Sequence, residues 1–207
     1  MNFSLPLWLR VVIGVLIVQG AWSWWRDRPQ SDPPGILAAA EPIQEDLAGA
    51  ATIAHGRWML TPRAHYDITA RVLGRERYRI DLLSGLVPVD LALGWGPMSD
   101  GRVLATLEIG QAARFYWVHW SAEPPLPPAE IMHHSANLHA IPADRATERA
   151  LEGLRTGEVV HLAGELVDGR RDDGAYINTS MTRTDTGPGA CEVMLVRTLE
   201  RVAVQRP

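Results

Sequence analysis

The segment IMHHSANLHAIP, at positions 131–142, holds three of the seven histidines of this 207-residue chain. Imidazole binds transition metals and transfers protons near neutral pH, so such a cluster is a candidate metal or catalytic site. His133, His134 and His139 are spaced by one, five and six residues, whereas two histidines on one face of a helix lie three or four residues apart. We therefore expect neither a metal nor a cofactor if the segment is helical. These three histidines are the candidate ligands if it is not.

Cys191 is the only cysteine of the chain, which excludes an internal disulfide bond. With His134 as a general base, its thiol is a candidate nucleophile. The alternative follows from periodicity, because Cys191, Val193 and Leu195 share one side of an expected strand. A free cysteine in such a position behaves as a small hydrophobic residue of the core. The sequence favours this second interpretation.

Asp185 lies in the stretch TRTDTGPGACE. Asp-Thr-Gly is the turn that carries the catalytic carboxylate of aspartic proteases, which pair two such groups. The chain has no second copy of the motif, so a homodimer would have to supply it. The alternative is a tight turn in which Asp185 accepts backbone hydrogen bonds, while Gly187 and Gly189 allow positive φ.

A row of four arginines on one face of an alternating stretch is the candidate binding site. Apolar and polar residues alternate on both sides of Gly74 between positions 66 and 82, which predicts a β-hairpin with one wet face. The arginines of that face are Arg71, Arg75, Arg77 and Arg79. They suit a protein partner or anionic lipid headgroups, and the alternative is a solvated face with cross-strand ion pairs. Trp95, in a glycine-rich loop at 91–100, is a further expected contact.

Residues 5–25 are almost entirely apolar, with Arg10 near the start and three tryptophans at the end. This pattern predicts a transmembrane helix that acts as a signal-anchor, and the alternative is a cleaved signal peptide. We expect an anchor at 1–27, a proline- and alanine-rich linker at 28–42, and a single β-rich domain at 43–207. The protein is then a single-pass protein of the bacterial inner membrane with its main domain outside the cytoplasm.

The remaining patterns predict a mainly β fold with one or two short helices. We expect a second hairpin, with strands at 103–109 and 113–120, and a short helix at 129–139. Asp144 is the expected N-cap of another helix that Gly157 ends. Strands are expected at 158–167, 175–183 and 191–204. Together with the preceding helix, these strands are similar to a small OB-like barrel, which places such a barrel in the C-terminal third.

Three motifs, DLALGWGPMSD, HSANLHAIPA and TRTDTGPGACE, resemble an uncharacterised family of bacterial membrane-anchored proteins. The resemblance implies no activity, so it assigns no role to any residue. The function expected is binding or scaffolding at the cell envelope. One alternative is a hydrolytic enzyme, metal-dependent or not, whose centre joins His134, Asn137 and His139 to Asp185 and Cys191. The other is an OB-type module for single-stranded nucleic acid, against which the net charge of −4 argues.

Overall fold

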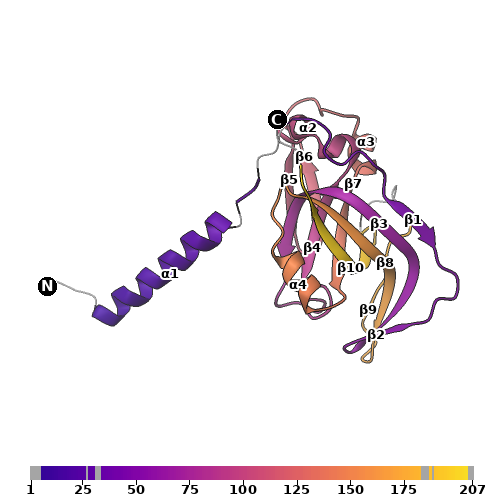
Figure 1. The fold of residues 1–207 in the computed structure, drawn as a ribbon, viewed down its shortest axis with the longest axis horizontal. Coiled ribbons are helices and arrows are strands. Elements are labelled where there is room, and N and C mark those ends of the chain that lie inside the picture. Colours follow the sequence, from indigo (N-terminus) through magenta and orange to yellow (C-terminus); the bar gives the residue numbers. More distant parts are fainter. Residues whose placement is uncertain (1–5, 27, 31–33, 183–186, 188, 205–207) are drawn as a thin grey trace.

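The longest strand of the computed structural model is β3 (Trp58–Arg77), whose 20 residues bend round the body of the protein (Figure 1). The structure describes all residues except 1–5, 27, 31–33, 183–186, 188 and 205–207. The first part of β3 pairs with β8 (Val159–Arg171) and its last part pairs with β4 (Val89–Gly94), in both cases antiparallel. β3 therefore pairs with a different strand along each part of its length.

Two further strands complete a ring. β4 pairs with β7 (Ser135–Pro142), β7 lies parallel to β10 (Glu192–Val202), and β10 pairs with β8. The order β3-β4-β7-β10-β8 thus returns to β3. The short strands β1 (Ile43–Asp46), β2 (Ile53–His55) and β9 (Tyr176–Ile177) extend this sheet outside the ring. The sequence predicts a barrel in the C-terminal third, whereas the strands of the observed ring extend from Trp58 to Val202.

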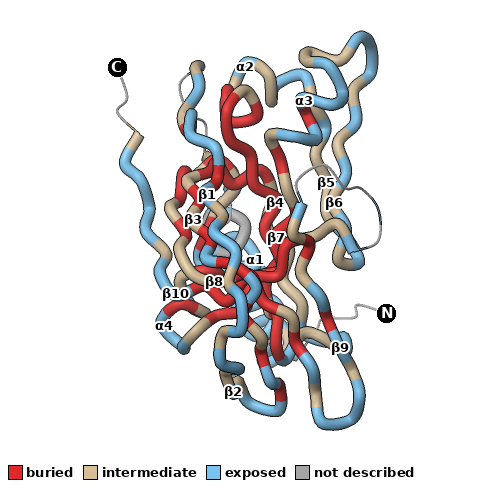
Figure 2. Tube along the Cα trace, turned by 90° about the vertical axis from the view of Figure 1, so that its right-hand side faces the viewer, coloured by how far each residue is buried: buried red, intermediate tan, exposed pale blue. Residues whose placement is uncertain are grey.

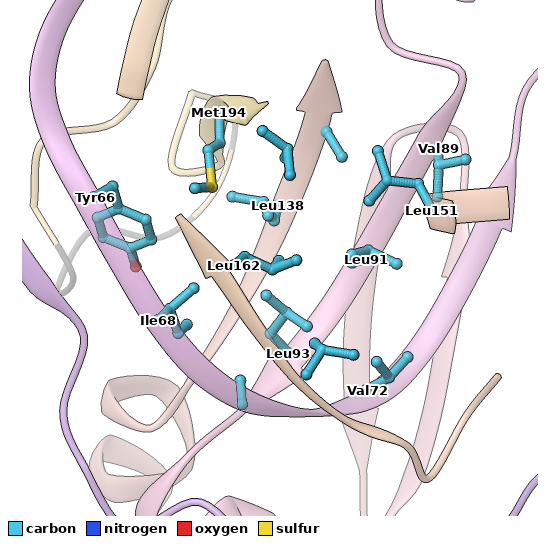
Figure 3. Close-up of a cluster of buried hydrophobic side chains, with 14 of the residues drawn as sticks. Tyr66, Ile68, Val72, Val89, Leu91, Leu93, Leu138, Leu151, Leu162 and Met194 are labelled. Atoms are coloured by element: carbon cyan, nitrogen blue, oxygen red, sulfur yellow. The ribbon is translucent and has the colours of Figure 1, made fainter. Parts of the chain in front are cut away.

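The interior of the ring is apolar because alternate residues of each strand point inward. Figure 3 shows inward side chains of different strands packed against one another, and Figure 2 shows the buried residues concentrated in the ring strands. The strand residues of this core include Tyr66, Ile68, Val72, Val89, Leu91, Leu93, Leu138, Leu162 and Met194. Side chains at the intervening positions of β4, β7 and β10 point to the outer face of the ring.

The first hairpin predicted from the sequence is wrong, because β3 continues through Gly74. The register with β4 shifts between Val72 and Gly74, as at a β-bulge. A Cβ on Gly74 would lie 2.5 Å from the side-chain oxygen of Gln111. The glycine therefore permits a close approach to a neighbouring strand and not a chain reversal.

A long insertion lies between β4 and β7. It contains the 3-10 helix η1 (Gly96–Ser99), α2 (Gly101–Leu104), β5 (Glu108–Ala112), β6 (Phe115–His119) and α3 (Pro128–His133). β5 and β6 confirm the second predicted hairpin, with Ala113-Arg114 as its turn. The strand predicted at 103–109 is wrong over its first part, because α2 extends to Leu104 and β5 begins at Glu108. The predicted helix at 129–139 is half wrong, since α3 ends at His133 and the rest is strand β7.

Helix α4 (Arg145–Glu152) follows β7 and confirms the predicted cap. The Asp144 carboxylate accepts a hydrogen bond from the backbone N–H of Thr147 at 2.8 Å. Gly157 lies beyond the end of the helix, whose C-cap is Gly153. The buried side chains of Leu151 and Leu154 join the core of the ring, which α4 closes at one end.

Helix α1 (Leu7–Arg26) lies apart from the ring (Figure 1). Among the residues that the structure describes, no helix combines the length and hydropathy needed to cross a membrane. Part of the predicted linker contacts the body, because the backbone N–H groups of Leu37 and Ala38 donate to the Ser99 hydroxyl at 3.1 Å. Residues 37–38 therefore pack on η1.

Closure of the ring predicts the effect of adding a methyl group at Gly164. This residue lies in β8 between β3 and β10, and an added Cβ would overlap the backbone oxygen of Leu195. We expect Gly164→Ala to lower the free energy of unfolding by about 1–3 kcal/mol, measured by urea denaturation. Gly85→Ala is the control, because a Cβ there meets open space. Equal losses for both variants would contradict this account of closure.

Candidate functional site

Three neighbouring strands bring Asp90, His139 and Cys191 into one row on the outer face of the ring. Asp90 of β4 and His139 of β7 are direct partners in the antiparallel ladder. In the parallel ladder, His139 is opposite Val193 and Leu138 is opposite Glu192. Extending that register by one residue places Cys191 beside Asn137. The row therefore follows from strand order and register alone.

The three side chains contact one another. His139 Nδ1 lies 2.9 Å from Asp90 Oδ1, with side-chain exposures of 10% and 1%. The ring N–H is not aligned for a hydrogen bond to this oxygen, so the attraction is chiefly between charges. On the other side, the Cys191 side chain is near enough to the His139 ring to favour its charged form. Asn137 Nδ2 also donates to Cys191 Sγ, at 3.5 Å.

These contacts change the acidity of the imidazole. Burial favours the neutral ring and lowers the pKa of His139. The interactions with Asp90 and with the Cys191 side chain favour the charged ring and outweigh burial, so the pKa of His139 is raised to about 9. At neutral pH His139 is therefore a buried imidazolium between a carboxylate and a sulfur atom.

The tip of the β5–β6 hairpin covers the row. Arg114 Nη1 donates to Asp90 Oδ1 at 2.9 Å, and Nε and Nη2 donate to Asp81 at 2.9 Å. The same guanidinium lies 3.7 Å from the centre of the Tyr78 ring. Asp90 is thus held between Arg114 and His139, which fixes the position of its carboxylate.

The backbone of the same hairpin tip holds Asn137. Its Nδ2 donates to the Arg114 carbonyl oxygen at 3.1 Å, and its Oδ1 accepts from Gln111 Nε2 at 3.0 Å. Ala113 and Arg114 have φ of 49° and 71°, values that residues with a Cβ rarely adopt. This backbone strain is part of what aims both the carbonyl and the guanidinium of Arg114 at the row.

A pocket of about 170 Å³ opens beside the thiol. Cys191 and Asn137 line one part of it, and Ser135, two residues from Asn137 on the same face of β7, lines another. Trp95, Phe115, Tyr116 and Met132 contribute its large side chains, and the lining is completed by Ala136, Thr182, Gly187, Ala190 and Glu192. Among Asp90, His139 and Cys191, the thiol is the group that lines the pocket.

His134, the base expected for Cys191, lies outside the row. Its Nε2 is 3.3 Å from a Glu41 carboxylate oxygen and its Nδ1 is 3.3 Å from a Glu130 carboxylate oxygen. Glu41 also accepts a hydrogen bond from Trp95 Nε1 at 2.9 Å. His134 and Trp95 therefore attach residue 41 to the insertion, and His139 takes the place expected for His134.

His133, the remaining histidine candidate, does not line the pocket beside the thiol. His133 is exposed, and its ring packs edge-on against His134 with centroids 5.1 Å apart. Asp185 lies outside the described residues. In the part of the chain that the structure describes, no group of three or more His, Cys, Asp or Glu side chains is arranged to hold a metal ion.

The arginine row is divided between different environments. Arg71 is buried and its Nη1 donates to the Ser99 carbonyl at 3.1 Å. Arg75 donates to the Glu152 and Leu154 carbonyls, and Arg77 also donates to the Glu152 carbonyl. These carbonyls end helix α4, where cations are favourable. Arg79 is exposed, so the four side chains do not form one continuous surface.

Sequence reasoning missed Asp90 and Arg114. Asp90 is a single carboxylate inside the apolar run LVPVDLALG, and an isolated charge in a buried strand indicates a paired or functional group. Arg114 gives no comparable signal, because it is identified only by the turn that places it over Asp90. Asn137 and His139 belonged to the expected hydrolytic centre, and the structure joins both to Cys191.

No protein-family model, curated protein or solved structure matches the chain. The geometry and the residue types of the row are therefore what indicate its chemistry.

The raised pKa of His139 predicts a pH-dependent stability. The imidazolium pairs with Asp90 in the folded state, so its contribution is complete below the unfolded pKa of about 6.5 and is lost as the pH rises through about 9. Relative to His139→Gln, the wild-type protein should lose on the order of 1–3 kcal/mol of unfolding free energy between these pH values. Urea denaturation across this range measures the difference.

Asp90→Asn should remove this pH dependence, because the charge that favours the imidazolium is gone. His161→Gln is the matched control, since His161 also pairs with an aspartate, Asp67, at 2.9 Å but lies away from the row. This control should keep the wild-type slope. A wild-type slope no different from that of His139→Gln would contradict the ion pair.

Proposed function

We propose that the protein is a cysteine-dependent acyl-transfer enzyme, in its simplest form a hydrolase. Cys191 is the nucleophile, His139 exchanges the proton, and Asp90 orients and stabilises the imidazolium. The observation that carries the proposal is the His139–Asp90 ion pair with Cys191 near the same imidazole, beside a pocket. A nucleophile, a base on it and a third group on the base are the parts that this chemistry requires.

The proposed reaction has two stages. The Cys191 thiolate attacks a carbonyl carbon, a C–S bond forms, and the bond to the leaving group breaks as that group takes the proton of the His139 imidazolium. Water then gives a proton to neutral His139 and attacks the thioester carbonyl. The C–S bond breaks, a carboxylic acid leaves, and the thiolate and imidazolium are restored. Overall, one ester, thioester or amide reacts with one water to give an acid and an alcohol, thiol or amine.

Asn137 and Arg114 have supporting roles in this proposal. Asn137 Nδ2 is 3.5 Å from Sγ, which makes it a candidate donor to the oxyanion that develops during attack. Arg114 is a positioning residue, because its guanidinium holds Asp90 and its carbonyl holds Asn137. The hairpin tip thereby also keeps water from the buried side of the row.

The ring supports the finer proposal of an OB-type barrel. Its strand order, the parallel pairing of β7 with β10, and a helix between its third and fourth strands are the arrangement of that fold. OB-folds bind ligands on the face of their second and third strands. Those strands are β4 and β7 here, which carry Asp90 and His139. Because a fold does not by itself define a function, the contacts of the row remain the main support for the proposed enzyme.

We also propose that α1 holds the protein at a membrane. The helix lies apart from the ring (Figure 1), and an exposed apolar surface of this size is typical of an interaction site. Its exposed apolar side chains include Leu7, Trp8, Ile17, Val18 and Trp22. With the sequence pattern of residues 5–25, this exposure supports a membrane location.

The row predicts how the thiol reacts. Because Cys191 is the only cysteine, labelling by iodoacetamide and acylation by 4-nitrophenyl acetate report on one atom. We expect Cys191→Ser to abolish both reactions and His139→Gln to slow ester hydrolysis about 10²–10⁴-fold. Asp90→Asn should slow it as well. Stopped-flow absorbance and intact-mass measurement of the acyl-enzyme test these values.

The histidines outside the row provide controls for that experiment. His134→Gln and His161→Gln should leave the hydrolysis rate within about twofold, since neither side chain contacts the thiol in the arrangement above. Circular dichroism checks that each variant folds. A wild-type protein that forms no acyl-enzyme, or a His139→Gln variant as fast as wild type, would overturn the proposed enzyme.

The membrane proposal is tested by flotation of the full chain with phosphatidylethanolamine and phosphatidylglycerol liposomes. We expect the full chain to float in a density gradient at high salt, because burial of apolar side chains is insensitive to screening. A variant lacking residues 1–27 should remain at the bottom. Full chain that stays in the bottom fraction would refute the membrane role of α1.

A further inference from the structure

The pocket beside Cys191 has the geometry of a binding site for one part of a substrate. Cys191, Ser135 and Trp95 line it together, and His139 does not. Phe115 and Met132 line it and are 49% and 40% exposed, so they stand at its opening. A group bound there would place its attached carbonyl at the sulfur.

The Tyr116, Ser135 and Asn137 side chains of the pocket are already hydrogen-bonded to the protein. The Tyr116 and Ser135 hydroxyls are 2.6 Å apart, and Ser135 Oγ donates to the Ile131 carbonyl at 2.6 Å. The Asn137 amide is held by Gln111 and by the Arg114 carbonyl. These groups have little capacity left for a polar ligand, while the Trp95, Phe115 and Met132 side chains offer apolar contact.

The charge of the pocket selects against anions. Glu192 lines it with Tyr116, and the carboxylate is close enough that its charge, after burial, contributes to a raised pKa of the Tyr116 hydroxyl. A second negative charge in so small a space would be repelled. The volume of about 170 Å³ is close to that of a protein cavity of roughly 150 Å³ that binds benzene.

We infer that this pocket is the acyl-group site of the proposed enzyme, and that it takes a neutral, apolar acyl group about as large as a benzene ring. The inference rests on the proposed function, because it names the substrate class of the same thiol. The substrates are therefore esters, thioesters or amides of aromatic or short branched acids. Acids that carry a second carboxylate are disfavoured.

The experiment compares three 4-nitrophenyl esters on the full chain in detergent micelles. The esters carry an acetyl, a phenylacetyl or an anionic glutaryl group, and the rate of thiol acylation is the readout. We expect kcat/KM for the phenylacetyl ester to exceed that for the acetyl ester by about tenfold or more, once each is divided by its rate with a free thiol. The glutaryl ester should be slower than the acetyl ester on the same scale.

Two methionine variants test where the preference arises. Met132→Ala removes part of the pocket wall and should lower the phenylacetyl-to-acetyl ratio about three- to tenfold. Met59→Ala is matched to it, because Met59 is 47% exposed on β3 and does not line this pocket. It should leave the ratio unchanged. Thermal unfolding of both variants confirms that they fold.

The outcomes separate this inference from the proposed function. Acylation of Cys191 with a ratio near one, with a ratio that Met132→Ala leaves unchanged, or with a preference for the glutaryl ester overturns the acyl pocket while the thiol enzyme stands. No acylation by any of the three esters overturns the enzyme and the pocket together. A ratio that falls in Met132→Ala alone supports both.

Discussion

The pairing of β3 with both β4 and β8 is the constraint on which the rest of the structure depends. A strand of 20 residues that hydrogen-bonds to two partners closes the sheet and gives its apolar face an interior to bury. Closure leaves β4, β7 and β10 adjacent, with every second side chain directed outward. Since side chains alternate along strands, strand register fixes which side chains are neighbours on the outer face as well as in the core. The row Asp90–His139–Cys191 is largely a product of that order, because Asp90 and His139 lie in the sheet and Cys191 directly precedes β10.

The cost of burying charge explains why the hairpin and the row belong together. Asp90 is almost completely buried, and a carboxylate there is stable only if cations compensate for the lost water. Two cations do so, the Arg114 guanidinium from above and the His139 imidazolium from the neighbouring strand. The same compensation keeps the imidazolium charged beside the sulfur atom. Stability and chemistry therefore share the same charges, which is a common property of functional sites.

Local patterns predicted much of the fold. The alternation around Ile68, the hairpin that includes Phe115 and the Asp144 cap depend only on neighbouring residues, and all three are present. The sequence predicts a turn at Gly74 because a bulge and a turn both interrupt alternation, and only the partner strand distinguishes them. Cys191 was correctly placed on one face with Val193, but whether that face is the core or the outer surface depends on ring closure. The contact of Asp90 with His139 depends on strand register over long separations, which no local pattern contains.

Because of the strained turn at Ala113-Arg114, the hairpin tip should open more readily than the ring. The ring is held by continuous ladders on every side, whereas the hairpin tip is held by the ionic and hydrogen-bonding contacts of a few side chains and stores unfavourable backbone energy. Local openings of this kind occur far more often than global unfolding. Exposure of the Asp90 carboxylate to solvent would therefore follow the lifting of the hairpin, on a timescale independent of the thermal stability of the barrel.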